Sequence, residues 1–194
     1  MSTQARVALP AWSERLLTDL DKSDERAKEL TSRLTDEQLN WRAAPDTWSI
    51  GQCLEHLCIA NEKYLPAISA ALAGKPVGRV EEIKLGWFAR WFLRSFIEPS
   101  SQTKRAPAPK KIMPGSRVES SVLDRFLLTN HSTRDLIRRA AAYDVNHVRF
   151  LNPFVRGIRF TVGTGLQIIC SHERRHLLQA ERVKQSPNFP TKVR

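Results

Sequence analysis

Four stretches of the chain carry apolar side chains at steps of three and four residues, which is the spacing of one face of an α-helix. No segment shows sustained two-residue alternation flanked by turn residues, so the sequence predicts no sheet. Helices of about 20 to 25 residues with long connections before the third and the fourth predict an all-α four-helix bundle. The four stretches cover about residues 11–34, 49–74, 116–142 and 161–185.

Local signals predict where the helices begin and end. Pro66, inside the second stretch, predicts a kink or an early end, and Gly74 predicts the stop of that helix ahead of Pro76. Ser or Thr followed three residues later by Glu or Gln predicts a capping box at a helix start. Three such pairs are present: Thr35 with Gln38 at a single short turn, Ser49 with Gln52 at the second helix, and Ser116 with Glu119 at the third.

The connection between the second and third predicted helices is long, spanning residues 75–115. Within it, residues 86–97 predict a short amphipathic helix. Its aromatic face would hold Trp87, Phe88, Trp91, Phe92 and Phe96, with Arg90 and Arg94 opposite. We interpret this helix as a lid packed on the bundle, with a membrane-surface or partner-binding helix as the alternative. The rest, "EPSSQTKRAPAPKKIMPGS", is basic and Pro-rich and predicts an extended strap.

The length of 194 residues suits one helical-bundle domain over residues 1–194, large enough to fold without disulfides or a structural metal. Cys53, Cys58 and Cys170 are odd in number and form no C-x-x-C pair, so neither a disulfide framework nor a thiolate zinc site is expected. The N-terminus lacks the pattern of a signal peptide, and no apolar run is long enough to span a membrane. We therefore expect a cytoplasmic protein.

The positive charge is concentrated in one part of the chain. Residues 1–75 carry 9 basic and 11 acidic residues, whereas residues 76–194 carry 22 and 9, and the whole chain has a net charge of +11. Such asymmetry indicates a nucleic-acid face, an anionic membrane contact or attraction of an anionic substrate. Nucleic acid is the least favoured, because no helix-turn-helix, zinc-finger or RNP pattern accompanies the charge. A homodimer is the default expectation for assembly.

The fourth helical stretch contains "CSHERRHLLQ", in which His172 and His176 lie one turn apart on the apolar face, followed one turn later by Gln179. Packing alone would favour leucine at these positions. Burying such polar groups without partners costs about 1 to 3 kcal/mol each, so something should satisfy them. A metal ion would do so, and hydrogen bonds to facing helices or water are the alternative.

The same stretch matches the H-E-x-x-H of zinc peptidases, whose third ligand comes from downstream. Gln179 occupies the place of the motif glycine and Arg182 that of a third histidine, and only 18 residues follow His176. Glu173, beside two arginines, is interpreted as a surface charge rather than a general base. A zinc peptidase is therefore a less favoured hypothesis, and a third ligand must come from upstream.

Three upstream histidines are candidates for that ligand. His131 aligns with a mostly polar helix face, which predicts a solvated side chain. His147 lies in a predicted loop, where it could be solvated or line a pocket. His56 lies on the second predicted helix beside the small residues Cys53 and Ala60, which would allow another helix to approach. His56 is the best candidate.

These residues carry a resemblance to a known family. Residues 34–65 and 163–183 resemble the DinB/YfiT-like superfamily, in which a tryptophan leads into a second helix with one histidine and the fourth helix ends in H-x-x-x-H, often followed by glutamine. The matching residues are Trp48, His56, His172, His176 and Gln179. The resemblance implies a four-helix bundle with unusual connectivity and a divalent metal held by the three histidines. Some members transfer low-molecular-weight thiols or use them as cofactors.

The ligand type limits the chemistry. Three neutral imidazoles leave a divalent ion its full charge and an open position, as in catalytic sites, and zinc, nickel or iron suits them. Such an ion can lower the pKa of bound water to about 7 or hold a thiolate. Gln179 could orient a ligand or cap the bundle end, and no residue is assigned a catalytic role.

Two classes of function follow. The main hypothesis is a metal-dependent hydrolase or thiol or small-group transferase, and the basic surplus favours a small anionic substrate or a carboxylate-bearing thiol cofactor. The alternative is a non-catalytic stress-response or binding bundle with a vestigial metal site, whose basic surface contacts nucleic acid or lipid.

Overall fold

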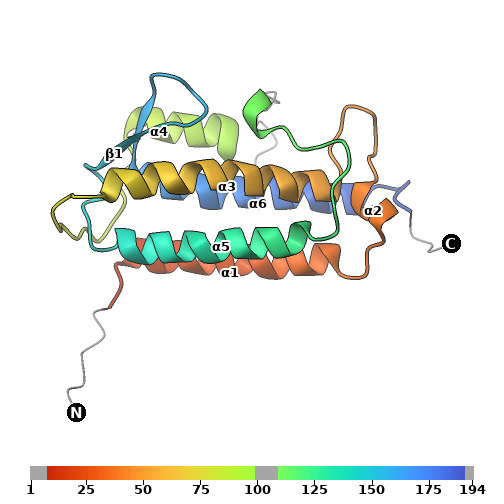
Figure 1. Cartoon of the computed structure of the whole chain (residues 1–194), viewed down its shortest axis with the longest axis horizontal. Helices are drawn as coiled ribbons and strands as arrows, with labels where there is room; N and C mark the ends of the chain where they lie inside the picture. The colour runs from red at the N-terminus through yellow and green to blue at the C-terminus, as the bar shows by residue number, and fades with distance from the viewer. Residues whose placement is uncertain (1–7, 99–108, 191–194) are drawn as a thin grey trace, which may run out of the picture.

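Four long helices lie along one another and form most of the molecule (Figure 1). The computed structural model describes residues 8–98 and 109–190. The fold is therefore mostly helical, as predicted, and the predicted lengths are close to those observed. The four helices are α1 (Ala11–Thr31), α3 (Ile50–Leu72), α5 (Val122–Ala140) and α6 (Val162–Lys184).

The helices are arranged as two layers, with α3 and α6 in one and α1 and α5 in the other (Figure 1). Both α3 and α5 begin at the end of the bundle where the short helix α2 (Asp36–Asn40) lies, and α1 and α6 run the opposite way. Adjacent parallel helices need a connection that returns along the bundle. This explains the long segment between α3 and α5, although residues 99–108 of the predicted Pro-rich strap lie outside the described residues.

The capping boxes predicted at Thr35 and Ser49 are both present and begin α2 and α3. The prediction that Pro66 ends the second helix early is wrong, because α3 continues to Leu72. Pro66 is exposed, whereas Ile68, two residues further on, is fully buried. Proline in a helix interior removes a backbone hydrogen bond and costs about 3 kcal/mol of stability. Packing of this last part of α3 against the core therefore offsets that cost.

The third predicted helix begins later than expected, at Val122, and the capping box at Ser116 does not form. The reason lies at Val118, whose backbone is bound by another part of the chain. Its N–H donates to Asn40 Oδ1 at 2.7 Å, and its carbonyl accepts from Asn40 Nδ2 at 2.9 Å. These bonds hold residues 116–118 outside the helix.

A small hairpin contradicts the prediction of no sheet. Its strands β1 (Arg149–Leu151) and β2 (Arg159–Thr161) are antiparallel, with Phe150 paired with Phe160. Both phenylalanines are buried, while the outer residues of β1 are exposed. Strands of three residues are too short for the two-residue alternation that sequence reasoning requires.

The predicted amphipathic helix forms α4 (Trp87–Phe92) and continues as a π-helical turn, η1 (Leu93–Ile97). The prediction of a single aromatic face is wrong. Phe88 and Phe92 pack against Phe160 of the hairpin, with ring centroids at 6.2 and 5.4 Å. Trp87 and Trp91 instead point to solvent. This segment and the hairpin together cover part of the α3/α6 layer (Figure 1).

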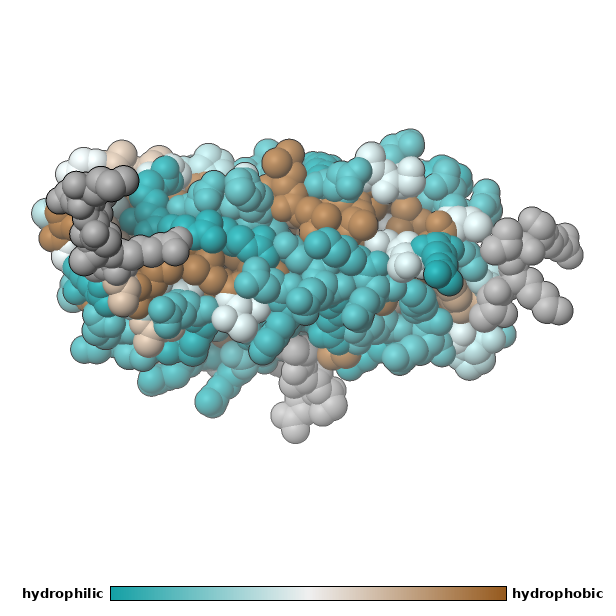
Figure 2. All heavy atoms as spheres, turned by 90° about the horizontal axis from the view of Figure 1, so that it is seen from below, coloured by the Kyte–Doolittle hydropathy of each residue, from teal (hydrophilic) through white to brown (hydrophobic). Residues whose placement is uncertain are grey.

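The apolar core runs the length of the bundle, and the three cysteines are buried in it as free thiols. Burial raises the pKa of the Cys58 thiol to about 12, so it is not a thiolate near neutral pH. Within the described ranges, no helix is long and apolar enough to cross a membrane. The face formed by α1 and α5 is mostly hydrophilic (Figure 2).

Candidate metal centre

Three imidazoles meet between α3 and α6. His56 comes from α3, and His172 and His176 come from successive turns of α6; one ring nitrogen of each lies within 4.8 Å of the others. His131 and His147 are elsewhere, both exposed, where they contact Asp135 and Asp144. The structure thus brings together the three histidines selected from the sequence and leaves the other two in solvent.

Two of the rings are oriented by hydrogen bonds at their outer nitrogen. His56 Nδ1–H donates to the backbone carbonyl of Ile112 at 2.7 Å, and His176 Nδ1–H donates to Gln179 Oε1 at 3.0 Å. Because both partners are acceptors, these bonds leave each Nε2 with its lone pair free. Neighbours of this kind hold metal-binding histidines in the required tautomer.

The spacing of the inner nitrogens fits one shared ion. His56 Nε2 lies 3.2 Å from His172 Nε2. Two imidazole ligands on one tetrahedral zinc, each at 2.0–2.1 Å, lie about 3.3 Å apart. The three ring centroids are 4.6 to 4.9 Å from one another. The donor set and its spacing therefore fit a divalent metal with three nitrogen ligands.

Trp48 covers one side of the imidazole cluster. Its ring lies 4.6 Å from that of His56 and 5.5 Å from that of His176, centroid to centroid. It directly precedes the Ser49 cap of α3, so the capping box positions it. Both of these histidines are buried, and His172 is the one of the three that keeps some exposed surface.

The protein environment keeps the three imidazoles neutral. Burial lowers the pKa of His56 to about 4, and it lowers the pKa of His172 and of His176 well below the usual range. The charge of Arg175 lowers the pKa of all three further, and neighbouring imidazoles add to the effect at His172 and His176. Neutral imidazoles keep the lone pairs that metal binding requires.

Glu173 is not a surface charge, and the prediction that it would be is wrong. Its side chain is fully buried between the four long helices. Its carboxylate accepts hydrogen bonds from Asn61 Nδ2 at 2.9 Å and from Asn130 Nδ2 at 3.3 Å. Burial raises the pKa of Glu173 to about 7. Because both oxygens are held by these amides, the carboxylate is not directed at the imidazoles as a peptidase base would be.

The two arginines after Glu173 have different partners. Arg174 forms an ion pair with Asp19 of α1. Arg175 is partly buried, and its Nη1 donates to the carbonyl of Phe96 at 2.7 Å; it forms no ion pair with any carboxylate in the described part of the chain. Its charge acts on all three histidines. An uncompensated cation therefore lies beside the cluster.

Some of these contacts had no signal in the sequence. The Ile112 acceptor is a backbone carbonyl, which any residue could supply, in a three-residue 3-10 turn (Lys110–Ile112). Asn61 and Asn130 are polar residues at inward positions of their helices, which could have been noticed as unusual. Their common partner, Glu173, lies on a third helix and is visible only in the structure.

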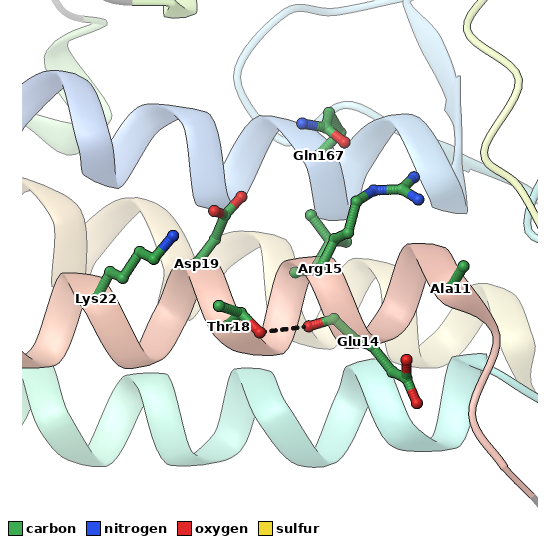
Figure 3. Close-up of a pocket in the computed structure, with 8 residues that line it drawn as sticks. Ala11, Glu14, Arg15, Thr18, Asp19, Lys22 and Gln167 are labelled. Carbon is green, nitrogen blue, oxygen red and sulfur yellow. Dashed lines mark hydrogen bonds between the residues drawn. The ribbon is translucent and has the colours of Figure 1, made fainter.

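A groove between α1 and α6 is a second candidate site, lined by side chains of both helices (Figure 3). Two of the four charged residues that line it are paired: Arg15 with Glu82, and Asp19 with Arg174. It contains no histidine or cysteine. Its lining residues are Ala11, Glu14, Arg15, Leu16, Thr18, Asp19, Lys22 and Gln167.

Comparison with known proteins agrees with this geometry. A family model described as the DinB superfamily matches residues 19–180. The chain belongs to the DinB superfamily. Among solved structures it is similar to YfiT from Bacillus subtilis, described as a probable metal-dependent hydrolase with an unusual four-helix bundle topology. That match has a TM-score of 0.58 and 14% identity over 95% of this chain and 93% of the other. A search of curated protein sequences finds no match.

Proposed function

We propose that this DinB protein is a metal-dependent enzyme that holds a divalent ion through His56, His172 and His176. It hydrolyses a small anionic molecule or transfers a small group to it. The observation that carries this proposal is the convergence of three neutral imidazoles, two of them with Nε2 freed by an acceptor at Nδ1. The description of the YfiT structure points the same way.

The donor set suits zinc, nickel or iron, and three ligands leave a position open for substrate. A bound divalent ion supplies Lewis acidity, which activates water or a thiol near neutral pH. The chain's own residues supply the rest. The Ile112 carbonyl and Gln179 hold the rings, Trp48 excludes water from one side, and the substrate enters on the side of His172, the least buried of the three histidines.

Arg175 supports an anionic substrate. Its guanidinium lies close enough to act on all three histidines and has no carboxylate partner among the described residues. An anionic group of the substrate would supply the partner that the Arg175 guanidinium lacks, because guanidinium binds carboxylate or phosphate through paired hydrogen bonds. The same arrangement suits a carboxylate-bearing thiol cofactor, so hydrolysis and thiol transfer are the two reaction classes.

Metal binding tests the site. Protein prepared without an affinity tag and stripped with chelator is titrated with Zn²⁺ by calorimetry, beside His56→Ala and His172→Ala. Wild type should bind one ion per chain, and each variant should bind at least about 100-fold more weakly, since a ligand is lost. His131→Ala and His147→Ala are matched controls and should bind as wild type does. Equal binding by all five proteins would refute the site.

Turnover tests the reaction class. Metal-loaded protein is offered small carboxylate-bearing esters and amides, with and without a low-molecular-weight thiol. Hydrolysis without thiol favours a hydrolase, and dependence on thiol favours a transferase. Arg175→Gln should raise KM for the anionic substrates, whereas Arg174→Gln should not. Metal binding without turnover of either kind would favour the non-catalytic alternative.

A further inference from the structure

Helix α4 and the turn η1 present an outward stripe of alternating tryptophan and arginine. Trp87, Arg90, Trp91 and Arg94 are all exposed and follow one another at steps of three, one and three residues, so they share one face. Tryptophans on one face of a short helix normally lie on the side that the helix buries. Here Trp87 is 76% and Trp91 50% exposed.

The stripe is held outward by the packing beneath it. Phe88 and Phe92, on the inner side of α4, pack against Phe160 of the hairpin, and Leu93 is buried in the core. Arg175 of α6 donates to the Phe96 carbonyl and fixes the end of the segment. The tryptophans therefore lie outside because the inner positions are already occupied by other aromatic rings.

The hairpin, which packs against α4 through Phe160, carries exposed residues of the same kind. Arg149, Leu151 and Arg159 are exposed and lie on the opposite face of the hairpin from the buried Phe150 and Phe160. Helix α4 and the hairpin both lie on the side of the α3/α6 layer away from α1 and α5 (Figure 1). We call the three hairpin residues and the four stripe residues the tryptophan–arginine face.

The charge of this face selects its partner. Its four arginines form no ion pair with any described carboxylate. A second copy docked face to face would bring these arginines against one another, which is unfavourable. An anionic surface would neutralise the arginines. The exposed Leu151 and tryptophans would be buried by an apolar layer just below that charge. The headgroup region of a bilayer offers both.

We propose that the tryptophan–arginine face binds the surface of an anionic phospholipid bilayer. The tryptophans and Leu151 insert at the headgroup level, and the arginines pair with lipid phosphates. The face seen in Figure 2, on α1 and α5, is mostly hydrophilic and remains in water. The helices lie flat on the membrane and none crosses it. This binding does not depend on the metal centre.

Sedimentation with vesicles tests the proposal. The full-length protein is mixed with vesicles of phosphatidylcholine alone or of phosphatidylcholine and phosphatidylglycerol in equal parts. Binding should require phosphatidylglycerol and weaken in about 0.5 M salt, which screens exposed charge. Trp87→Ala with Trp91→Ala should weaken it at least about tenfold. Arg90→Gln with Arg94→Gln should weaken it about 30-fold, since each basic residue near an anionic surface contributes about fivefold.

Matched controls lie on the opposite face. Leu128→Ala and Arg138→Gln remove an exposed leucine and an exposed arginine of α5 and should bind vesicles as wild type does. Lipids brominated in the upper acyl chain should quench the tryptophan fluorescence of wild type and not that of the double tryptophan variant. Unchanged circular dichroism shows that each variant is folded, and Trp87→Ala alone serves if the double variant is not.

Several outcomes would overturn the proposal. One is that the protein fails to bind anionic vesicles, and another is that the tryptophan and arginine variants bind them as well as wild type does. Equal binding to both vesicle types would also contradict it. Self-association of the free protein that the tryptophan variants abolish, without vesicle binding, would assign the face to a second copy. Binding of single-stranded nucleic acid with the same sensitivity, again without vesicle binding, would assign it to a nucleic-acid partner.

Discussion

Replacing the buried Glu173 by glutamine should change how stability depends on pH. Burial raises the pKa of this carboxyl from 4.5 to about 7 in the folded protein, so the fold favours its protonated form. The resulting stabilisation is complete below pH 4.5, the unfolded value, and is lost as the pH rises through about 7. Glutamine cannot ionise, so Glu173→Gln lacks this contribution at every pH.

The magnitude follows from the size of the shift. One pKa unit corresponds to about 1.4 kcal/mol, and between pH 8 and pH 5 most of the shift is expressed. On acidification across this range, wild type should gain about 2 to 3 kcal/mol of unfolding free energy relative to Glu173→Gln. Groups common to both proteins cancel in this comparison.

The hydrogen bonds around Glu173 set a constant offset between the two proteins. The carboxylate accepts from the amides of Asn61 and Asn130, whose own Oδ1 atoms are buried and have no hydrogen-bond partner among the described residues. A glutamine amide would face one of these donors with a donor of its own, unless Asn130 turns its oxygen inward. This rearrangement adds an offset that does not vary with pH, which is why the slope is the quantity to measure.

Urea unfolding followed by circular dichroism, on chelator-treated protein at pH 5 to 8, gives the two free energies. A difference between wild type and Glu173→Gln that stays constant within about 0.5 kcal/mol over that range would refute the reasoning. It would mean that Glu173 titrates alike in the folded and unfolded chains, and that the buried carboxyl is not destabilised in its charged form.

Three further substitutions test individual contacts. Ser49→Ala removes the cap of α3 and should lower the unfolding free energy by about 1 kcal/mol in urea titrations; no loss would mean that the cap contributes nothing. Gly165→Ala places a Cβ 2.6 Å from ring atoms of Phe150 and should cost about 1 to 3 kcal/mol, seen as a lower Tm, whereas an unchanged Tm would show that the hairpin yields freely. Gln179→Ala removes the acceptor at His176 Nδ1 and should weaken Zn²⁺ binding about 10- to 100-fold in calorimetry; unchanged affinity would show that this hydrogen bond does not orient the ring.

Local patterns predicted local structure well. The capping boxes at Thr35 and Ser49 depend on residues three positions apart, and both form as expected. The imidazole cluster could be predicted from the sequence for a related reason. His172 and His176 interrupt an apolar stripe at a one-turn spacing, and His56 has small neighbours on its helix, so each helix could be assigned a face before the helices were placed together.

The wrong predictions for Ser116 and Glu173 have a different origin. In both cases the observed structure depends on a residue far away in the sequence. The Ser116 box is a valid local signal, but Asn40 binds the backbone of Val118 and keeps that segment out of the helix. Glu173 looked like a surface charge because its neighbours in sequence are arginines. Its actual partners include Asn130 on another helix, and sequence spacing within α6 carries no information about them.

The parallel pairing of neighbouring helices has a consequence for synthesis of the protein. His56 and His172 are separated by 116 positions, and α6 leaves the ribosome after the other three long helices that the structure describes. A nascent chain therefore offers a single histidine of the cluster until the final helix has emerged and packed between α1 and α3. Contacts between segments so far apart form late in folding, because a long loop must close before they are made. Capture of a metal ion would then mark completion of the bundle, and a chain truncated before α6 would lack two of the three imidazoles.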